Sequence, residues 1–158
     1  MAYTNPGLAI ANNANAVAVM TPVNTQVNPV TQASNGRRLL GVVKGVSLIT
    51  TGDVVQMPII NSTAWVPELI VTANGTLAGA QGSVATAALG VFTAAAAGGT
   101  AIKANATLAN NSAVGSAISL ATTVANLAFT NQTLFINVGT ALATAAVDIY
   151  LYGTDLSA

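Results

Sequence analysis

Four carboxylates are the residues of this chain that could carry acid–base or metal chemistry, because histidine and cysteine are both absent. They are Asp53, Glu68, Asp148 and Asp155, and they stand far apart in the sequence. Neither a D-x-D pair nor a calcium-binding loop occurs, and these are the spacings that bring oxygen ligands together. The sequence therefore predicts solvated or turn-associated carboxylates, with no metal-ligating residues and no cofactor-binding residues.

Nucleophilic catalysis has equally little support in the sequence. A serine nucleophile needs a base, and without histidine that base would be a lysine. Neither Lys44 nor Lys103 stands in an S-x-x-K motif, and neither G-x-S-x-G nor G-x-x-x-x-G-K-[ST] occurs. We therefore expect no catalytic residues and interpret the chain as a protein other than an enzyme.

Three aromatic residues, Trp65, Tyr150 and Tyr152, could together form a platform for stacking a sugar. Trp65 stands just before Pro67 at the expected start of a strand. The two tyrosines alternate with aliphatic residues and so share one face of the last strand. Covering a sheet or meeting a neighbouring subunit is the more ordinary use of such residues, and we favour it.

Asparagines begin five N-x-[ST] sequences, a pattern that marks glycosylated loops in secreted proteins. They are Asn61, Asn74, Asn105, Asn110 and Asn131. The first ten residues lack the basic and continuous apolar regions of an export signal. We therefore interpret these asparagines as turn formers and expect synthesis in a cytoplasm.

Charge is scarce along the 158 residues: 5% are charged, and the net charge is zero. The positively charged residues of the chain are Arg37, Arg38, Lys44 and Lys103. Binding to nucleic acid depends on neutralising several phosphates at once, so no nucleic-acid partner is expected. The apolar run at Ala94–Ala97 is far shorter than the roughly 20 residues that cross a bilayer, so no membrane association is expected.

The chain changes character near Gly36. Residues 1–36 are rich in Asn, Thr, Gln and Ala, and they contain Pro6, Pro22 and Pro29 without a sustained apolar period. This composition predicts an extended polar N-terminal arm that orders where it meets a surface. Residues 37–158 are expected to form the folded domain.

The folded domain carries short strand-like runs separated by turn residues. Leu134, Ile136 and Val138 alternate with Phe135 and Asn137. The same period of two occurs in Val147–Tyr152, the last expected strand. Asn74–Gly75 is a strong hairpin signal. The expected strands are Leu39–Ile49, Asp53–Ile60, Trp65–Thr72, Val84–Thr93, Thr100–Thr107, Gly115–Ala121, Thr133–Gly139 and Val147–Tyr152. About eight short strands predict an all-β fold, a jelly-roll-like β-sandwich.

Alanine-rich residues Ser83–Ala97 are the segment in which this prediction competes with a helix, since alanine is the best helix former. Gly90, the threonines and the Val91–Phe92 pair lower helix propensity. Gly98–Gly99 fits a hairpin as well as a helix cap. We favour a strand here.

From about Gly36 onward the chain resembles the capsid decoration, or cement, proteins of tailed bacteriophages. The resemblance rests on WVPELIVTANG (Trp65–Gly75), GVFTAAAAGGTAI (Gly90–Ile102), TLFINVG (Thr133–Gly139) and AAVDIYLYGTDLS (Ala145–Ser157). It implies a virion structural protein that binds the major capsid protein on the capsid exterior. It also implies a homotrimer at local threefold positions that stabilises the icosahedral shell against internal DNA pressure.

Two other functions compete with this interpretation. A phage tail-fibre or host-surface binding (adhesin) domain would use the same sandwich, but the aromatic content of 4% offers few residues for a binding site. An ice-binding or repeat scaffold would need a fixed sequence period, and none is found around Ala85–Thr123. Decoration of a capsid is therefore the favoured function.

Overall fold

The computed structural model describes residues 37–74, 83–109, 111, 113, 116–124 and 126–157. Residues 1–36, the predicted arm, lie outside the described residues. Within the described ranges the chain forms eight strands and no helix, so the all-β prediction is confirmed. These ranges consequently contain no helix that could span a membrane.

Each expected strand has a counterpart in the structure, with ends that differ by a few residues. The strands are β1 (Arg37–Ser47), β2 (Gly52–Pro58), β3 (Trp65–Asn74), β4 (Ala88–Ala94), β5 (Gly98–Thr107), β6 (Ala117–Ala121), β7 (Thr133–Thr140) and β8 (Ala146–Asp155).

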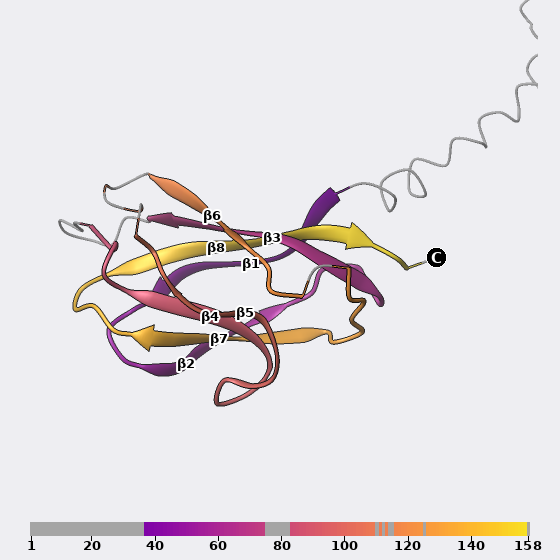
Figure 1. Ribbon diagram of the computed structural model, residues 1–158, viewed down its shortest axis with the longest axis horizontal. Helices are drawn as coiled ribbons and strands as arrows, with labels where there is room; N and C mark the ends of the chain where they lie inside the picture. The colour runs from indigo at the N-terminus through magenta and orange to yellow at the C-terminus, as the bar shows by residue number, and fades with distance from the viewer. Residues whose placement is uncertain are drawn as a thin grey trace, which may run out of the picture. The chain divides into compact units, whose positions relative to one another are not determined.

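The strands form two antiparallel sheets of four strands each, which lie one above the other in Figure 1. The upper sheet has the order β1-β8-β3-β6, and the lower sheet has the order β2-β7-β4-β5. The buried apolar side chains of both sheets form a common core, so the described part of the chain is a β-sandwich. An isolated bridge between Gly41 and Ile59 links the two sheets along one edge.

Alternating burial explains why these segments become strands. In β7, Leu134, Ile136 and Val138 point into the core. In β8, Ile149 and Leu151 are completely buried, whereas Asp148, Tyr150 and Tyr152, which alternate with them, are only half-buried. Side chains on a strand alternate between the two faces, so one apolar residue in every two supplies a complete inner face.

The alanine-rich segment forms the strand that the sequence predicts, with β4 spanning Ala88–Ala94. A tight turn joins it to β5, which pairs with it as a hairpin. Ala96 and Ala97 have φ values of 55° and 57° in this turn, and Gly99 follows at 66°. Glycine adopts this left-handed conformation without steric cost, which explains its place beside the turn.

The prediction of a hairpin at Asn74–Gly75 is wrong. Asn74 ends β3, but β3 pairs with β6 and β8, and the next strand, β4, belongs to the other sheet. The strands β1 and β2 also follow each other in sequence and lie in different sheets. A turn signal marks where the chain reverses, while the burial of apolar faces selects the pairing partner.

Gly153 in β8 is the position where the sheet tolerates no side chain. A Cβ there would lie 2.0 Å from the carbonyl oxygen of Val66 and 2.7 Å from a methyl carbon of Leu40. Because Val66 contributes backbone atoms, relief would require a shift between the paired strands β3 and β8.

Replacing Gly153 with alanine is expected to lower the free energy of unfolding by about 1 to 3 kcal/mol, the usual cost of overpacking a close contact. Urea denaturation of the full chain measures this loss. Gly139→Ala is the matched control, because the three atoms nearest to a Cβ at Gly139 all belong to the side chain of Asn105, whereas the atom nearest to a Cβ at Gly153 belongs to the backbone. Equal stability of the two variants would contradict the close backbone contact.

Candidate functional site

The most connected polar cluster surrounds Asp155 at the end of β8. The Asp155 side chain is 5% exposed, and its Oδ1 accepts a hydrogen bond of 2.6 Å from the Ser62 hydroxyl and one of 2.9 Å from the backbone N–H of Ser157. Asp155 Oδ2 lies 3.2 Å from Nη1 of Arg38, in the strand beside it. The carboxylate is therefore buried, paired and hydrogen-bonded, which corrects the expectation of a solvated or turn-associated group.

Arg38 extends this cluster to the loop between β2 and β3. Its Nη2 donates hydrogen bonds of 2.8 Å to the carbonyl of Ile60 and 2.7 Å to that of Asn61. The Ser157 hydroxyl accepts hydrogen bonds from the backbone N–H groups of Thr63 and Ala64. The cluster therefore ties together the start of β1, the β2–β3 loop and the end of β8.

Several opposing effects act on the pKa of Asp155. Burial raises it, because a charged carboxylate loses hydration. Hydrogen bonds from Ser62 and Ser157 and the positive charge of Arg38 lower it and prevail, so the pKa lies below its ordinary value. The carboxylate is consequently ionised at neutral pH and serves as an anchor for the loop rather than as a proton donor.

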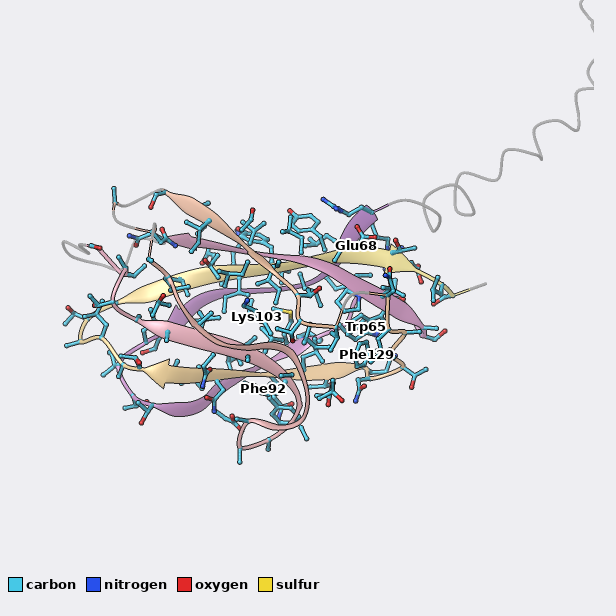
Figure 2. All side chains as sticks on the ribbon, viewed as in Figure 1. Trp65, Glu68, Phe92, Lys103 and Phe129 are labelled. Atoms are coloured by element: carbon cyan, nitrogen blue, oxygen red, sulfur yellow. The ribbon has the colours of Figure 1, made fainter. Side chains whose placement is uncertain are left out.

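Glu68 forms a second, more exposed pair on the outer side of the upper sheet, where Figure 2 labels it. Its Oε2 accepts a hydrogen bond of 2.7 Å from the Thr154 hydroxyl, and its Oε1 lies 2.7 Å from Nε of Arg37. These two contacts, the Thr154 bond first, lower the pKa of Glu68. A pocket of about 520 Å³ beside this pair is lined by Arg37, Val66, Pro67, Glu68, Thr122, Asn126 and Thr154.

Asp53, in strand β2 of the lower sheet, holds the turn between β4 and β5. It accepts a hydrogen bond of 2.8 Å from the Asn137 side chain and another from the backbone N–H of Ala96. Both bonds lower its pKa, the Asn137 bond more than the other. The Asn105 side chain continues this chain of amides with a hydrogen bond of 3.3 Å to Asn137. This arrangement fixes the turn that carries the left-handed alanines.

Asp148 also has a structural partner, since it accepts a hydrogen bond of 2.8 Å from the backbone N–H of Gly45. Gly45 has a φ of 64° and belongs to the irregular part of β1. The structure therefore brings no two of the four carboxylates together, and each one holds a local contact. Among the described residues no group of three or more acidic side chains is placed to bind a metal ion.

The three aromatic residues considered as a sugar platform are not on one surface. Trp65 is completely buried and stacks on Phe129 with ring centroids 5.3 Å apart, as Figure 2 shows between the two sheets. Its indole N–H donates a hydrogen bond of 3.0 Å to the carbonyl of Asn131. Tyr150 and Tyr152 lie on the opposite, outward face of β8. The shared platform is therefore excluded.

The outward face of the upper sheet carries two rows of uncharged residues that cross all four strands. The first row consists of Leu39, Tyr152, Leu69 and Ala121. The second row consists of Val42, Tyr150, Val71 and Ser119. We call these two rows the uncharged stripe. Arg37 and Glu68 lie beyond one end of it, and Lys44 and Asp148 lie beyond the other.

The asparagines of the five N-x-[ST] sequences fall into different environments. Asn61 is a turn former with a φ of 50°, and Asn131 lies in the loop before β7. Asn74 and Asn105 belong to strands β3 and β5, so the turn interpretation is wrong for both. Asn105 lies against Gly90 and Gly139, where the missing side chains leave room for its amide. Asn110 lies outside the described residues.

Replacing Asp155 with asparagine is expected to destabilise the fold at neutral pH by about 1 to 3 kcal/mol, since the charge-assisted contacts are lost while Arg38 stays partly buried. The folded pKa of Asp155 lies below its unfolded value, so its charge stabilises the fold above about pH 4. That contribution disappears as the pH falls through the folded pKa. The difference between wild type and Asp155→Asn should therefore narrow in acid, as measured by urea denaturation across pH.

Glu68→Gln is the control for this experiment, because the Arg37–Glu68 pair is exposed and screened by solvent. It should cost less stability than Asp155→Asn at neutral pH. An Asp155→Asn variant as stable as wild type at neutral pH would show that the buried cluster does not anchor the loop.

Comparison with known proteins assigns no family to this architecture. No protein family, curated protein or solved structure matches the chain. The functional interpretation therefore depends on the residues and contacts described above: a sandwich whose carboxylates hold its own strands, turns and loops, and whose upper sheet carries the uncharged stripe on its outer face.

Proposed function

We propose that the chain is a non-enzymatic structural protein that decorates the exterior of an icosahedral phage capsid and stabilises it by binding the major capsid protein. The observation that carries the proposal is the use of the four acidic side chains, which are Asp53, Glu68, Asp148 and Asp155. Each is held by hydrogen bonds within its own fold. What remains for a partner is an almost uncharged surface, which suits protein assembly more than chemistry on a small molecule.

The order of the strands supports a jelly roll as the finer description of this sandwich. The first strand pairs with the last, β2 with β7, β3 with β6, and β4 with β5. This is the pairing that results when a long antiparallel hairpin is rolled into two sheets. Double-sheet jelly rolls of eight strands occur in viral capsid proteins and in lectins, so the fold is compatible with the proposal without proving it.

One end of the sandwich offers apolar side chains for attachment. Three exposed residues, Ile60, Leu127 and Leu156, lie in the β2–β3 loop, in the β6–β7 loop and just after β8. Backbone hydrogen bonds join these segments, from Trp65 to Phe129 and from Leu156 to Ala64. Burying such residues against a shell would contribute the hydrophobic part of binding with few charges to desolvate.

An adhesin function has less support, because Trp65 is completely buried and cannot contact a ligand. Tyr150 and Tyr152 remain outside, where they are two members of a flat row rather than the lining of a pocket. Sugar-binding sites combine aromatic faces with convergent polar groups in a concave pocket. A screen of the full chain against glycans should therefore give no specific binding.

Binding to shells is expected to depend only weakly on salt, because screening acts on exposed charge pairs and this chain has few charges. The full chain is mixed with capsids that lack it, from the phage that encodes it. Occupancy at about 0.5 M salt should stay within roughly a factor of two of the occupancy at low salt. Absence of saturable binding at either ionic strength would contradict the proposed function.

Removing residues 1–36 is expected to leave the sandwich folded and to weaken shell binding by roughly a hundredfold, a few kcal/mol of lost contacts. All eight strands lie after these residues. The thermal midpoint of the shortened chain should therefore stay within about 3 °C of the full chain's value. Unchanged shell affinity would show that residues 1–36 do not contribute to shell binding. Loss of the melting transition would show that these residues contribute to the core.

A further inference from the structure

The turn between β4 and β5 folds back over the outer face of the lower sheet. Strand β7 lies between β4 and β2, yet the backbone N–H of Ala96 in the turn donates a hydrogen bond to Asp53 of β2. Asn137 of β7 donates to the same carboxylate. Its side chain points outward, because the residues on both sides of it belong to the core. Figure 1 shows the turn on the side of the lower sheet that faces away from the upper sheet. We call residues 94–99 the strap.

Phe92 is a buried aromatic residue on this outer face. It follows Val91 of the core and lies outside the core cluster, and Figure 2 labels it on the outer side of the lower sheet. Its ring lies over Gly90, where a Cβ would be 2.7 Å from the Phe92 Cε2 atom. Gly90 pairs with Asn137, which pairs with Asp53, so the ring and the anchor of the strap share one row across the sheet. A strap above this row explains why an outward phenylalanine is only 7% exposed.

The strap contains a turn that its own residues disfavour. A hydrogen bond of 3.0 Å from the Gly98 N–H to the Ala95 carbonyl closes the turn around Ala96 and Ala97. These two residues have φ values of 55° and 57°, the type I′ geometry in which Asn-Gly is strongly preferred. In this conformation the Cβ of alanine comes too close to the following carbonyl oxygen. Strained backbone of this kind persists only where surrounding contacts enforce it.

The Asp53 carboxylate supplies such a contact. It accepts hydrogen bonds from the backbone N–H of Ala96 and from the Asn137 side chain. These bonds, and a weaker one from the backbone of Ala97, lower the pKa of Asp53 and keep it ionised at neutral pH. Successive N–H groups in a turn form a concavity that binds an anion. Asp53 is itself exposed, however, so water competes with the strap for its oxygens.

We propose that the strap is a lid that opens while the sandwich stays folded, and that Asp53 holds it shut. Strain in the two alanines favours opening, and an exposed carboxylate is a weak anchor. Opening exposes the Phe92 ring beside Phe135, its neighbour on β7. It also joins that ring to a pocket of about 620 Å³, which is lined by Asp53, Val54, Val55, Gln56 and Phe135. The closed strap therefore conceals an aromatic surface that the open strap offers.

Amide hydrogen exchange of the full chain, followed by NMR, tests the lid independently of the proposed capsid function. The Ala96 amide should be protected at least about tenfold relative to an unstructured peptide, yet exchange at least about tenfold faster than Ile136 and Leu151 in the central strands β7 and β8. Urea up to about 1 M should accelerate the two core amides and leave Ala96 unchanged, since local opening exposes little surface. An Ala96 amide without protection, or one that follows the core amides in urea, would overturn the proposal.

Variants of the anchor and of the turn test the cause of the opening. Asp53→Asn leaves one acceptor oxygen for both Ala96 and Asn137, so the protection of the Ala96 amide should fall at least about tenfold. Ala97→Gly relieves the strain and should raise that protection by about fivefold. Asp148→Asn is the matched control, because that carboxylate has its contact in the upper sheet and should leave the protection of Ala96 unchanged. Equal effects of the two aspartate variants, or lower protection in Ala97→Gly, would overturn the proposal.

Discussion

The pairing of the last strand with two others is the interaction on which the rest of this structure depends. The last strand, β8, lies between β1 and β3, so the upper sheet is continuous only when the end of the chain is in place. Its inner face supplies Ile149 and Leu151 to a core that has no disulfide to reinforce it. The Asp155 carboxylate then fastens the end of the strand to Arg38 at the start of β1.

Scarcity of charge is the second constraint, and it explains how the ionisable groups are used. The acidic side chains hold a turn, a loop or a neighbouring strand, as Asp53 does for the β4–β5 turn and Asp155 for the β2–β3 loop. The surface that remains is polar through amides and hydroxyls, and apolar over the stripe on the upper sheet. Burying amides and hydroxyls costs less than burying charges when they find hydrogen-bond partners, which is compatible with the proposed association with protein.

Local sequence predicted the strands, because alternation in segments such as Thr133–Gly139 reports directly which side chains are buried. It did not predict which strands pair, since Asn74–Gly75 carries a turn signal while β3 finds its partners far along the chain. The Asp155 cluster was missed for the same reason. Ser62 and Asp155 are 93 residues apart, and no spacing rule relates them. The placement of Tyr150 and Tyr152 on the outward face was predictable from the period of two, whereas the burial of Trp65 was not.

Cryo-electron microscopy of particles of the phage that encodes the chain shows whether this sandwich is part of the capsid, as we propose. We expect density for an eight-stranded sandwich on the outer surface of the shell, with the end that carries Ile60 and Leu156 toward the capsid protein. A particle with a bare shell, or one that carries this chain only at the tip of its tail, would overturn the proposed function.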